Sequence, residues 1–206
     1  MDNILNDKGL NLGDFNYSPN KRSKIRAVVD FIWEMVKVTI ISLAIILPIR
    51  YFLIQPFYVK GASMEPNFYD HEYLIIDEIS YRFSDPGRGD IVVFKYPKDP
   101  SQYFIKRVVG LPGEKIEIKE GLVFIDGQTL REDYLTDDIL TQLPLGGYGE
   151  VVLAEGEYFL LGDNRSQSLD SRTFGPVARD FIIGRTWLRG WPFHRLTVFN
   201  APTYNF

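Results

Sequence analysis

The chain has 206 residues, room for one medium-sized domain or for a core with a smaller annex. Apolar residues make up 45% of it and aromatic residues 15%, which is enough to bury a core and excludes disorder over most of the length. The net charge of −4 does not suggest a nucleic-acid partner, and the absence of cysteine excludes disulfides, thiol nucleophiles and cysteine metal sites.

The N-terminal part combines a polar tail with an apolar segment. We expect residues 1 to about 25 to be a mobile tail. Residues 31–54 are mostly apolar, but their uncharged stretch, Val38 to Ile49, is shorter than the roughly 20 residues that a bilayer requires. A full span needs Lys37 or Arg50 to reach toward the headgroups. We favour a single membrane span; an amphipathic or buried core helix is the alternative.

The flanks of the apolar segment indicate its orientation. Lys60 stands where a cleavable signal peptide needs a small residue, so the segment is predicted to be an uncleaved anchor. Four basic residues precede it, which puts the N-terminus in the cytoplasm and the rest of the chain outside: Lys21, Arg22, Lys24 and Arg26.

Beyond the anchor the pattern is β. Short segments rich in Ile, Val, Phe and Tyr are predicted strands: Tyr73 to Ile76, Asp90 to Phe94, Tyr103 to Val109, Lys115 to Ile118, Leu122 to Ile125, Glu157 to Leu161 and Ile182 to Leu188. Glu120-Gly121 is predicted to be the tip of a hairpin, with a second turn at Asp126-Gly127. No long helical period follows residue 56, so we predict a mostly antiparallel β-domain.

Ser63 lies in the stretch VKGASMEP, residues 59–66, directly after the apolar segment. Two small residues, Gly61 and Ala62, precede it and leave the backbone open to a ligand chain. By itself this pattern is compatible with an ordinary turn as well as with a nucleophile.

Lys106 lies within an apolar run, YFIKRVVGLPGE, residues 103–114. Alternation puts Phe104, Lys106 and Val108 on one face and Ile105 and Arg107 on the other. The lysine is either an edge residue that reaches water or a desolvated amine. Deprotonation of an ordinary lysine side chain at pH 7 costs roughly 4.6 kcal/mol. Because burial lowers that penalty, a desolvated Lys106 could act as the base for a serine.

A polar stretch, LGDNRSQSLDSR, spans residues 161–172 and reads either as a solvated loop or as a source of a hydroxyl and paired charges for a site. His71 and His194 are the only histidines, and neither has neighbours that suggest a triad or a metal site.

Taken together and in this order, these stretches resemble the type I signal peptidase family. The resemblance rests on GASMEP, RGDIVVF (residues 88–94), FIKRVVGLPGE and GDNRSQSLDSR, followed by FGPV, and extends from about residue 50 to 192. Asn67-Phe68 departs from the commoner Thr-Leu, which puts local packing after Pro66 in question.

The resemblance implies that Ser63 is the nucleophile, Lys106 the general base, and Ser168 the hydroxyl that orients the lysine. The backbone N–H of Ser63 would contribute to the oxyanion hole, while Gly61 stands where some members have a second donor, which is left unidentified. Substrate-pocket candidates are Tyr58, Val59, Phe104 and Ile105. Structural support is implied for Arg107, Asp163, Asp170 and Arg172.

The family also implies an architecture: a polar cytoplasmic tail (residues 1–30), a transmembrane anchor (31–54) and an exported peptidase domain (55–206). That domain would be antiparallel and β-barrel-like, with a smaller inserted β subdomain at about 114–157. The implied substrates are secretory preproteins cut after small residues at the plasma membrane, with the catalytic domain on the extracytoplasmic face. No cofactor, metal or nucleic acid is expected.

Two other readings remain. A self-cleaving repressor-type peptidase shares the Ser/Lys dyad, but it needs a DNA-binding domain where residues 1–50 offer a tail and an apolar segment. A membrane-anchored β-domain that has lost catalysis would have no need to keep Ser63, Lys106 and Ser168 together.

Overall fold

The computed structural model describes residues 21–52, 55–136 and 138–200, and the chain divides into two units, residues 1–46 and 47–206. The predictions for residues 1–20 and for residues 53–54 therefore lie outside the described residues.

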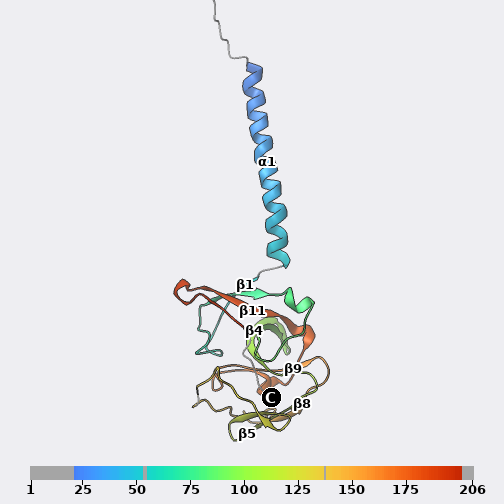
Figure 1. Ribbon diagram of the computed structural model, residues 1–206, viewed down its shortest axis with the longest axis vertical. Helices are drawn as coiled ribbons and strands as arrows, with labels where there is room; N and C mark the ends of the chain where they lie inside the picture. The colour runs from blue at the N-terminus through green and yellow to red at the C-terminus, as the bar shows by residue number, and fades with distance from the viewer. Residues whose placement is uncertain (1–20, 53–54, 137, 201–206) are drawn as a thin grey trace, which may run out of the picture. The chain divides into compact units, whose positions relative to one another are not determined.

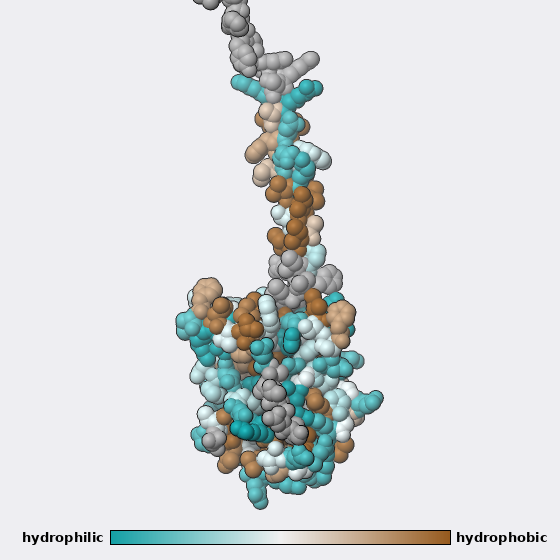
Figure 2. Space-filling model, in the orientation of Figure 1, coloured by the Kyte–Doolittle hydropathy of each residue, from teal (hydrophilic) through white to brown (hydrophobic). Residues whose placement is uncertain are grey.

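The first unit contains most of a long helix, α1 (Lys21–Phe52). It begins before the expected apolar segment, because the Lys, Arg and Ala residues that precede that segment are good helix formers. Residues 21–25, expected to belong to a mobile tail, are thus helical. Within α1, Lys24–Pro48 is long and apolar enough to cross a membrane, and apolar side chains predominate over its later half on the face that Figure 2 shows.

The second unit is mostly β, as predicted, and all its strand pairs are antiparallel (Figure 1). The larger sheet has the order β1-β2-β11-β3-β4-β9-β10, with β12 paired to β11. Its strands are β1 (Gln55–Tyr58), β2 (Tyr73–Asp77), β3 (Ile91–Tyr96), β4 (Asp99–Gly110), β9 (Glu157–Leu161), β10 (Val177–Ala178), β11 (Ile182–Trp191) and β12 (Thr197–Val198).

A smaller sheet, of order β7-β6-β5-β8, lies at the end of this unit away from β1 (Figure 1). Its strands are β5 (Lys115–Lys119), β6 (Leu122–Ile125), β7 (Gln128–Thr129) and β8 (Glu150–Val152). The β5–β6 turn has positive φ at Glu120 (52°) and Gly121 (81°), as a two-residue hairpin requires. Short helical turns complete the unit: η1 (Ser80–Arg82), α2 (Ser171–Phe174), η2 (Arg179–Phe181) and η3 (Phe193–Arg195).

The central strands of the larger sheet are buried on both faces. On β3, Val92 and Phe94 pack into one hydrophobic core, whereas Ile91 and Val93 pack into another. A third core fills the space around the smaller sheet and includes Phe159 of β9. Strands that pack on two sides are uninterrupted apolar runs. A lysine on the next strand therefore enters a dry interior.

Candidate active site

Lys106 occupies the middle of β4, directly opposite Val92 of β3. Its side chain packs beside the Phe104 ring, with Nζ 5.6 Å from the ring centroid, and only 4% of the residue is exposed. The predicted alternation holds, because Phe104 and Val108 contact one core and Ile105 contacts the other. The buried reading of the lysine is therefore the correct one.

Ser63 lies on a turn that two apolar anchors hold in place. We call residues 61–66 the serine turn. Met64 and Phe68 are buried in the core that includes side chains of β2 and β3, and this packing holds the turn in place. Gly61 has φ of +87°, which a side chain would disfavour, and its N–H donates to Asp70 Oδ1 at 2.9 Å.

The Lys106 amine and the Ser63 hydroxyl are in hydrogen-bond contact, with Nζ 2.7 Å from Oγ. The amine also donates to the Ile105 carbonyl at 2.7 Å. Burial lowers the pKa of Lys106 to about 8, against the opposing pull of the Asp170 and Asp163 carboxylates. When the amine is neutral, the same contact can reverse so that the Ser63 hydroxyl donates to the nitrogen lone pair.

The Ser63 backbone N–H donates to no group among the described residues. The N–H groups of its neighbours, Ala62 and Met64, are likewise without a hydrogen-bond partner in the part of the chain that the structure describes. Three consecutive free donors at a nucleophile-bearing turn are suited to bind a developing oxyanion.

Ser168 lies on the loop of residues 162–169, here called the terminal loop. Its Oγ is buried and has no hydrogen-bond partner among the described residues, so the expected hydrogen bond to Lys106 is not formed in this state. Ser168 Oγ and the Ser63 carbonyl oxygen nevertheless both lie within 3 Å of the point where a Gly162 Cβ would be. The loop thus brings this hydroxyl beside the serine turn.

The four support residues form two buried ion pairs, one at each end of the terminal loop. Arg107 donates twice to Asp163, through Nε at 2.8 Å and a terminal nitrogen at 2.6 Å. Arg172 donates twice to Asp170, at 2.8 and 2.7 Å, and Asp170 also caps α2. Because fully paired geometry is needed to hold a buried charge, these pairs fix the loop rigidly.

Asn67 and Phe68, where the sequence departs from the commoner pattern, are well packed. The Asn67 amide donates to Asp163 Oδ2 at 2.8 Å and to the Tyr134 carbonyl at 3.1 Å. Phe68 is fully buried. The serine turn is thereby tied to the Arg107–Asp163 pair.

Two further charge networks had no role assigned from sequence. Arg165 is buried and donates twice to Glu132. Glu72, 2% exposed, pairs with Arg189 at 2.9 Å and with Arg195 at 2.7 Å. Arg165 lies within the stretch GDNRSQSLDSR, but Glu72 gave no signal in the sequence, because its partners lie more than 100 residues away.

A cavity of about 780 Å³, the Ser63 cavity, opens beside the two reactive side chains. Residues 56–63, which run from β1 into the serine turn, form one wall, and residues 102–106 of β4 form another. All four predicted pocket residues line it: Tyr58, Val59, Phe104 and Ile105. The cavity is mostly bordered by apolar side chains, with Ser63 and Lys106 as convergent polar groups.

Neither histidine belongs to this arrangement. His71 is exposed and contacts Asp70 through Nδ1 at 2.7 Å, and His194 lies in η3. Among the described residues, no group of three or more histidine and carboxylate side chains could hold a metal ion.

Comparison with known proteins gives one family. The model of the signal peptidases, peptidase S26, matches residues 32–191. A probable signal peptidase I-2 of Synechocystis sp. is 37% identical over 168 residues, which cover 79% of this chain and 75% of that protein. The signal peptidase I of Bacillus amyloliquefaciens is 34% identical, with 85% and 94% covered. A solved signal peptidase I from Enterococcus faecalis V583 is 34% identical, covers 50% of this chain and 97% of its own, and has a TM-score of 0.42.

Proposed function

The chain belongs to the signal peptidase family, peptidase S26, and we propose that it cleaves signal peptides from preproteins, with Ser63 as nucleophile and Lys106 as general base. Members of this family are serine peptidases. The observation that carries the proposal is the 2.7 Å contact between Lys106 Nζ and Ser63 Oγ, at a lysine of which only 4% is exposed.

In the proposed acylation, Ser63 Oγ attacks the scissile carbonyl while its proton passes to Lys106 Nζ. The protonated amine then gives that proton to the leaving amine as the carbon–nitrogen bond breaks. Water hydrolyses the ester by the same route, with Lys106 again as base. Lowering the lysine pKa from 10.5 to about 8 reduces the free energy of forming the neutral amine at pH 7 by about 3 kcal/mol.

The oxyanion of each tetrahedral intermediate would be bound by the Ser63 N–H. Gly61 offers no side-chain donor, and its own N–H is held by Asp70. The second donor is therefore assigned to the free N–H of Ala62 or Met64. Backbone donors on a turn that is anchored by buried side chains need little reorganisation during reaction.

The residues around the dyad are given the following roles. Tyr58, Val59, Phe104 and Ile105 would shape pockets that accept only small side chains before the scissile bond. Ser168 would orient the Lys106 amine. The two buried ion pairs, Arg107–Asp163 and Asp170–Arg172, support the loop without taking part in the chemistry.

The apolar helix supports attachment to a lipid bilayer, which is the setting of this family. The finer topology is part of the proposal: a single pass through the plasma membrane, with residues 1–30 cytoplasmic, 31–54 in the membrane and the peptidase domain from 55 outside. The basic residues that precede the span support this orientation. The proposed partners are secretory preproteins and the bilayer, with no metal, cofactor or nucleic acid.

The test is cleavage of a preprotein at its signal-peptide junction by the purified full chain in detergent. Ser63→Ala and Lys106→Met should each abolish cleavage, while circular dichroism shows that both variants keep the wild-type fold. Full activity in either variant would refute the dyad. Cleavage at another site, or none by the wild type, would refute the substrate class.

A further inference from the structure

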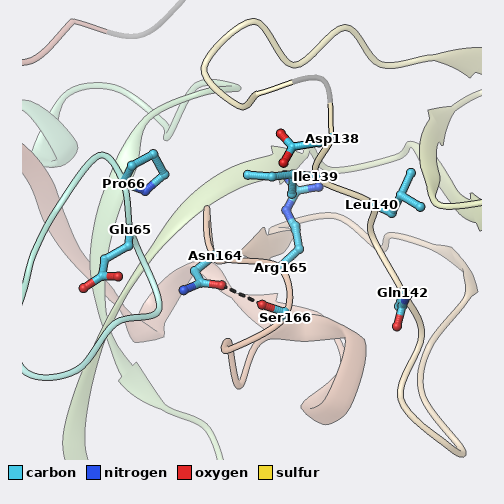
Figure 3. A pocket seen from close by; sticks show the side chains of 9 residues that line it. All are labelled: Glu65, Pro66, Asp138, Ile139, Leu140, Gln142, Asn164, Arg165 and Ser166. Carbon is cyan, nitrogen blue, oxygen red and sulfur yellow. Dashed lines mark hydrogen bonds between the residues drawn. The ribbon is translucent and has the colours of Figure 1, made fainter.

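A second cavity, of about 490 Å³, is lined in part by the serine turn (Figure 3). Three chain segments line it: Glu65 and Pro66, residues 138–140 with Gln142, and Asn164 to Ser166. We call it the Pro66 cavity. No step of the proposed reaction uses it.

The same two loops border both cavities. The serine turn contributes residues 61–63 to the Ser63 cavity and Glu65 and Pro66 to the Pro66 cavity. The terminal loop contributes Gln167 and Leu169 to the first and residues 164–166 to the second. Between them, the Asn164 N–H donates to the Ser63 carbonyl at 3.1 Å. When a polypeptide fills the Ser63 cavity up to its scissile bond, the residues that follow the bond can therefore enter the neighbouring Pro66 cavity.

Chain geometry says which residues of such a polypeptide reach it. Pro66 is three residues after Ser63, so their Cα atoms are at most about 11 Å apart. An extended substrate advances about 3.3 Å per residue. A substrate therefore needs no more than its first three or four residues after the scissile bond to span this distance, and the second to fourth lie within that reach.

The charges available in the cavity are negative. Glu65 and Asp138 line it from opposite walls, and neither has an ion-pair partner among the described residues (Figure 3). A hydrogen bond from the Thr136 side chain lowers the pKa of Asp138, so this exposed carboxyl is ionised at neutral pH. Arg165 is the single cation of the lining, and it donates hydrogen bonds to the Glu132 carboxylate and the Gly162 carbonyl.

The neutral part of the lining suits the stem of a long basic side chain. Pro66, Ile139 and Leu140 offer apolar surface next to the two carboxylates. Lysine and arginine side chains bury their methylene groups on such surface while the charged end stays at the polar rim. The Asn164 amide nitrogen, which donates to no group in the described ranges, can serve a substrate carbonyl.

We propose that the Pro66 cavity binds the second to fourth residues on the carboxyl side of the scissile bond, and that it favours lysine or arginine there over an acidic residue. This inference rests on the proposed function and extends it to the segment that becomes the new N-terminus.

The test uses preprotein-like peptides that are identical except for Lys, Gln or Glu at the third position after the scissile bond. We expect kcat/KM to be about five-fold higher for the Lys peptide than for the Glu peptide, the size of an exposed charge pair, and the ratio to shrink as salt is added. In a Glu65→Gln, Asp138→Asn double variant the ratio should fall to nearly one.

Glu155→Gln is the matched control, because it removes an exposed carboxylate that lines neither cavity, and it should keep the wild-type ratio. Equal cleavage of all three peptides by the wild type would overturn this inference and leave the proposed function standing. An unchanged ratio in the double variant would also overturn it. If no peptide is cleaved, the proposed function itself has failed.

Discussion

Gly162 and Ser168 lie so close that a single added methyl group could not fit between them. A Cβ on Gly162 would be 2.1 Å from Ser168 Oγ and 2.5 Å from the carbonyl oxygen of Ser63. Real atoms do not approach to these distances. The absence of a side chain at position 162 is thus what lets the terminal loop and the serine turn meet.

Gly162→Ala is therefore expected to displace both loops. A shift of about 1 Å in a catalytic group can lower the rate roughly a hundred-fold, and a loss of that size in kcat is predicted. Gly190→Ala serves as the control, because its Cβ would meet only ordinary contacts, the nearest at 3.8 Å. Steady-state cleavage by both variants checks this; equal rates would contradict the steric argument.

Ser168→Ala separates an orienting role from a structural one. The Ser168 hydroxyl is buried without a partner, so its removal should leave the melting temperature unchanged or slightly raised. The kcat of cleavage should nevertheless fall, by less than in the dyad variants, because the hydroxyl that orients the Lys106 amine is removed. A variant with lower stability and unaltered kcat would assign Ser168 to packing alone.

The rate should rise with pH as the Lys106 amine loses its proton. Because burial lowers its pKa to about 8, kcat/KM should increase about ten-fold per unit below pH 8 and level off above it. Measurements from pH 5 to 10 in constant ionic strength check this. A profile that is flat between pH 6 and 9, with chemistry shown to be rate-limiting, would exclude a titrating lysine.

Lys106→Met should stabilise the fold at pH 7 while abolishing activity. The folded pKa lies below the unfolded one, so the folded state disfavours the proton, and this penalty is complete below pH 8 and absent above about pH 10.5. At pH 7 the gain is up to about 3 kcal/mol, reduced by the lost hydrogen bonds. Melting curves of wild type and variant should converge as the pH rises toward 10.5. Lys95→Met, on the exposed part of β3, is the control and should show no such convergence.

Asp163→Asn should destabilise the fold strongly. It removes the charge of the buried carboxylate to which the Arg107 guanidinium donates twice, and breaking such a buried pair typically costs about 3–5 kcal/mol. Asp133→Asn removes one carboxylate from the exposed pair with Arg131 and should have no measurable effect. Thermal unfolding of the two variants side by side checks the difference, and equal melting temperatures would contradict it.

Most strands could be predicted because alternation and turn residues are local signals. The seven predicted strands all exist, and β4 carries its alternation through Phe104, Ile105 and Arg107 as expected. The short strands β1, β7, β8, β10 and β12 were missed. They have two to four residues each, too few for a periodic pattern, and they exist because neighbouring strands supply their hydrogen bonds.

The candidate site, too, could be predicted from the sequence only in part. The residue types at Ser63, Lys106 and the pocket positions were readable from the sequence with the help of the family pattern. The hydrogen bond expected between Ser168 and Lys106 is not present, and the Glu72–Arg189–Arg195 network was not foreseen. Each of these depends on the packing of side chains from distant segments, which no local pattern encodes.

The sequence by itself determined that a serine follows two small residues and that a lysine interrupts an apolar strand, because these are properties of neighbouring residues. Only the tertiary structure decided that the two side chains, 43 residues apart in the chain, meet at 2.7 Å with the amine excluded from water. Desolvation is produced by all the strands that surround an atom. The chemical state of Lys106 is therefore a property of the packed sheet rather than of the residue and its neighbours.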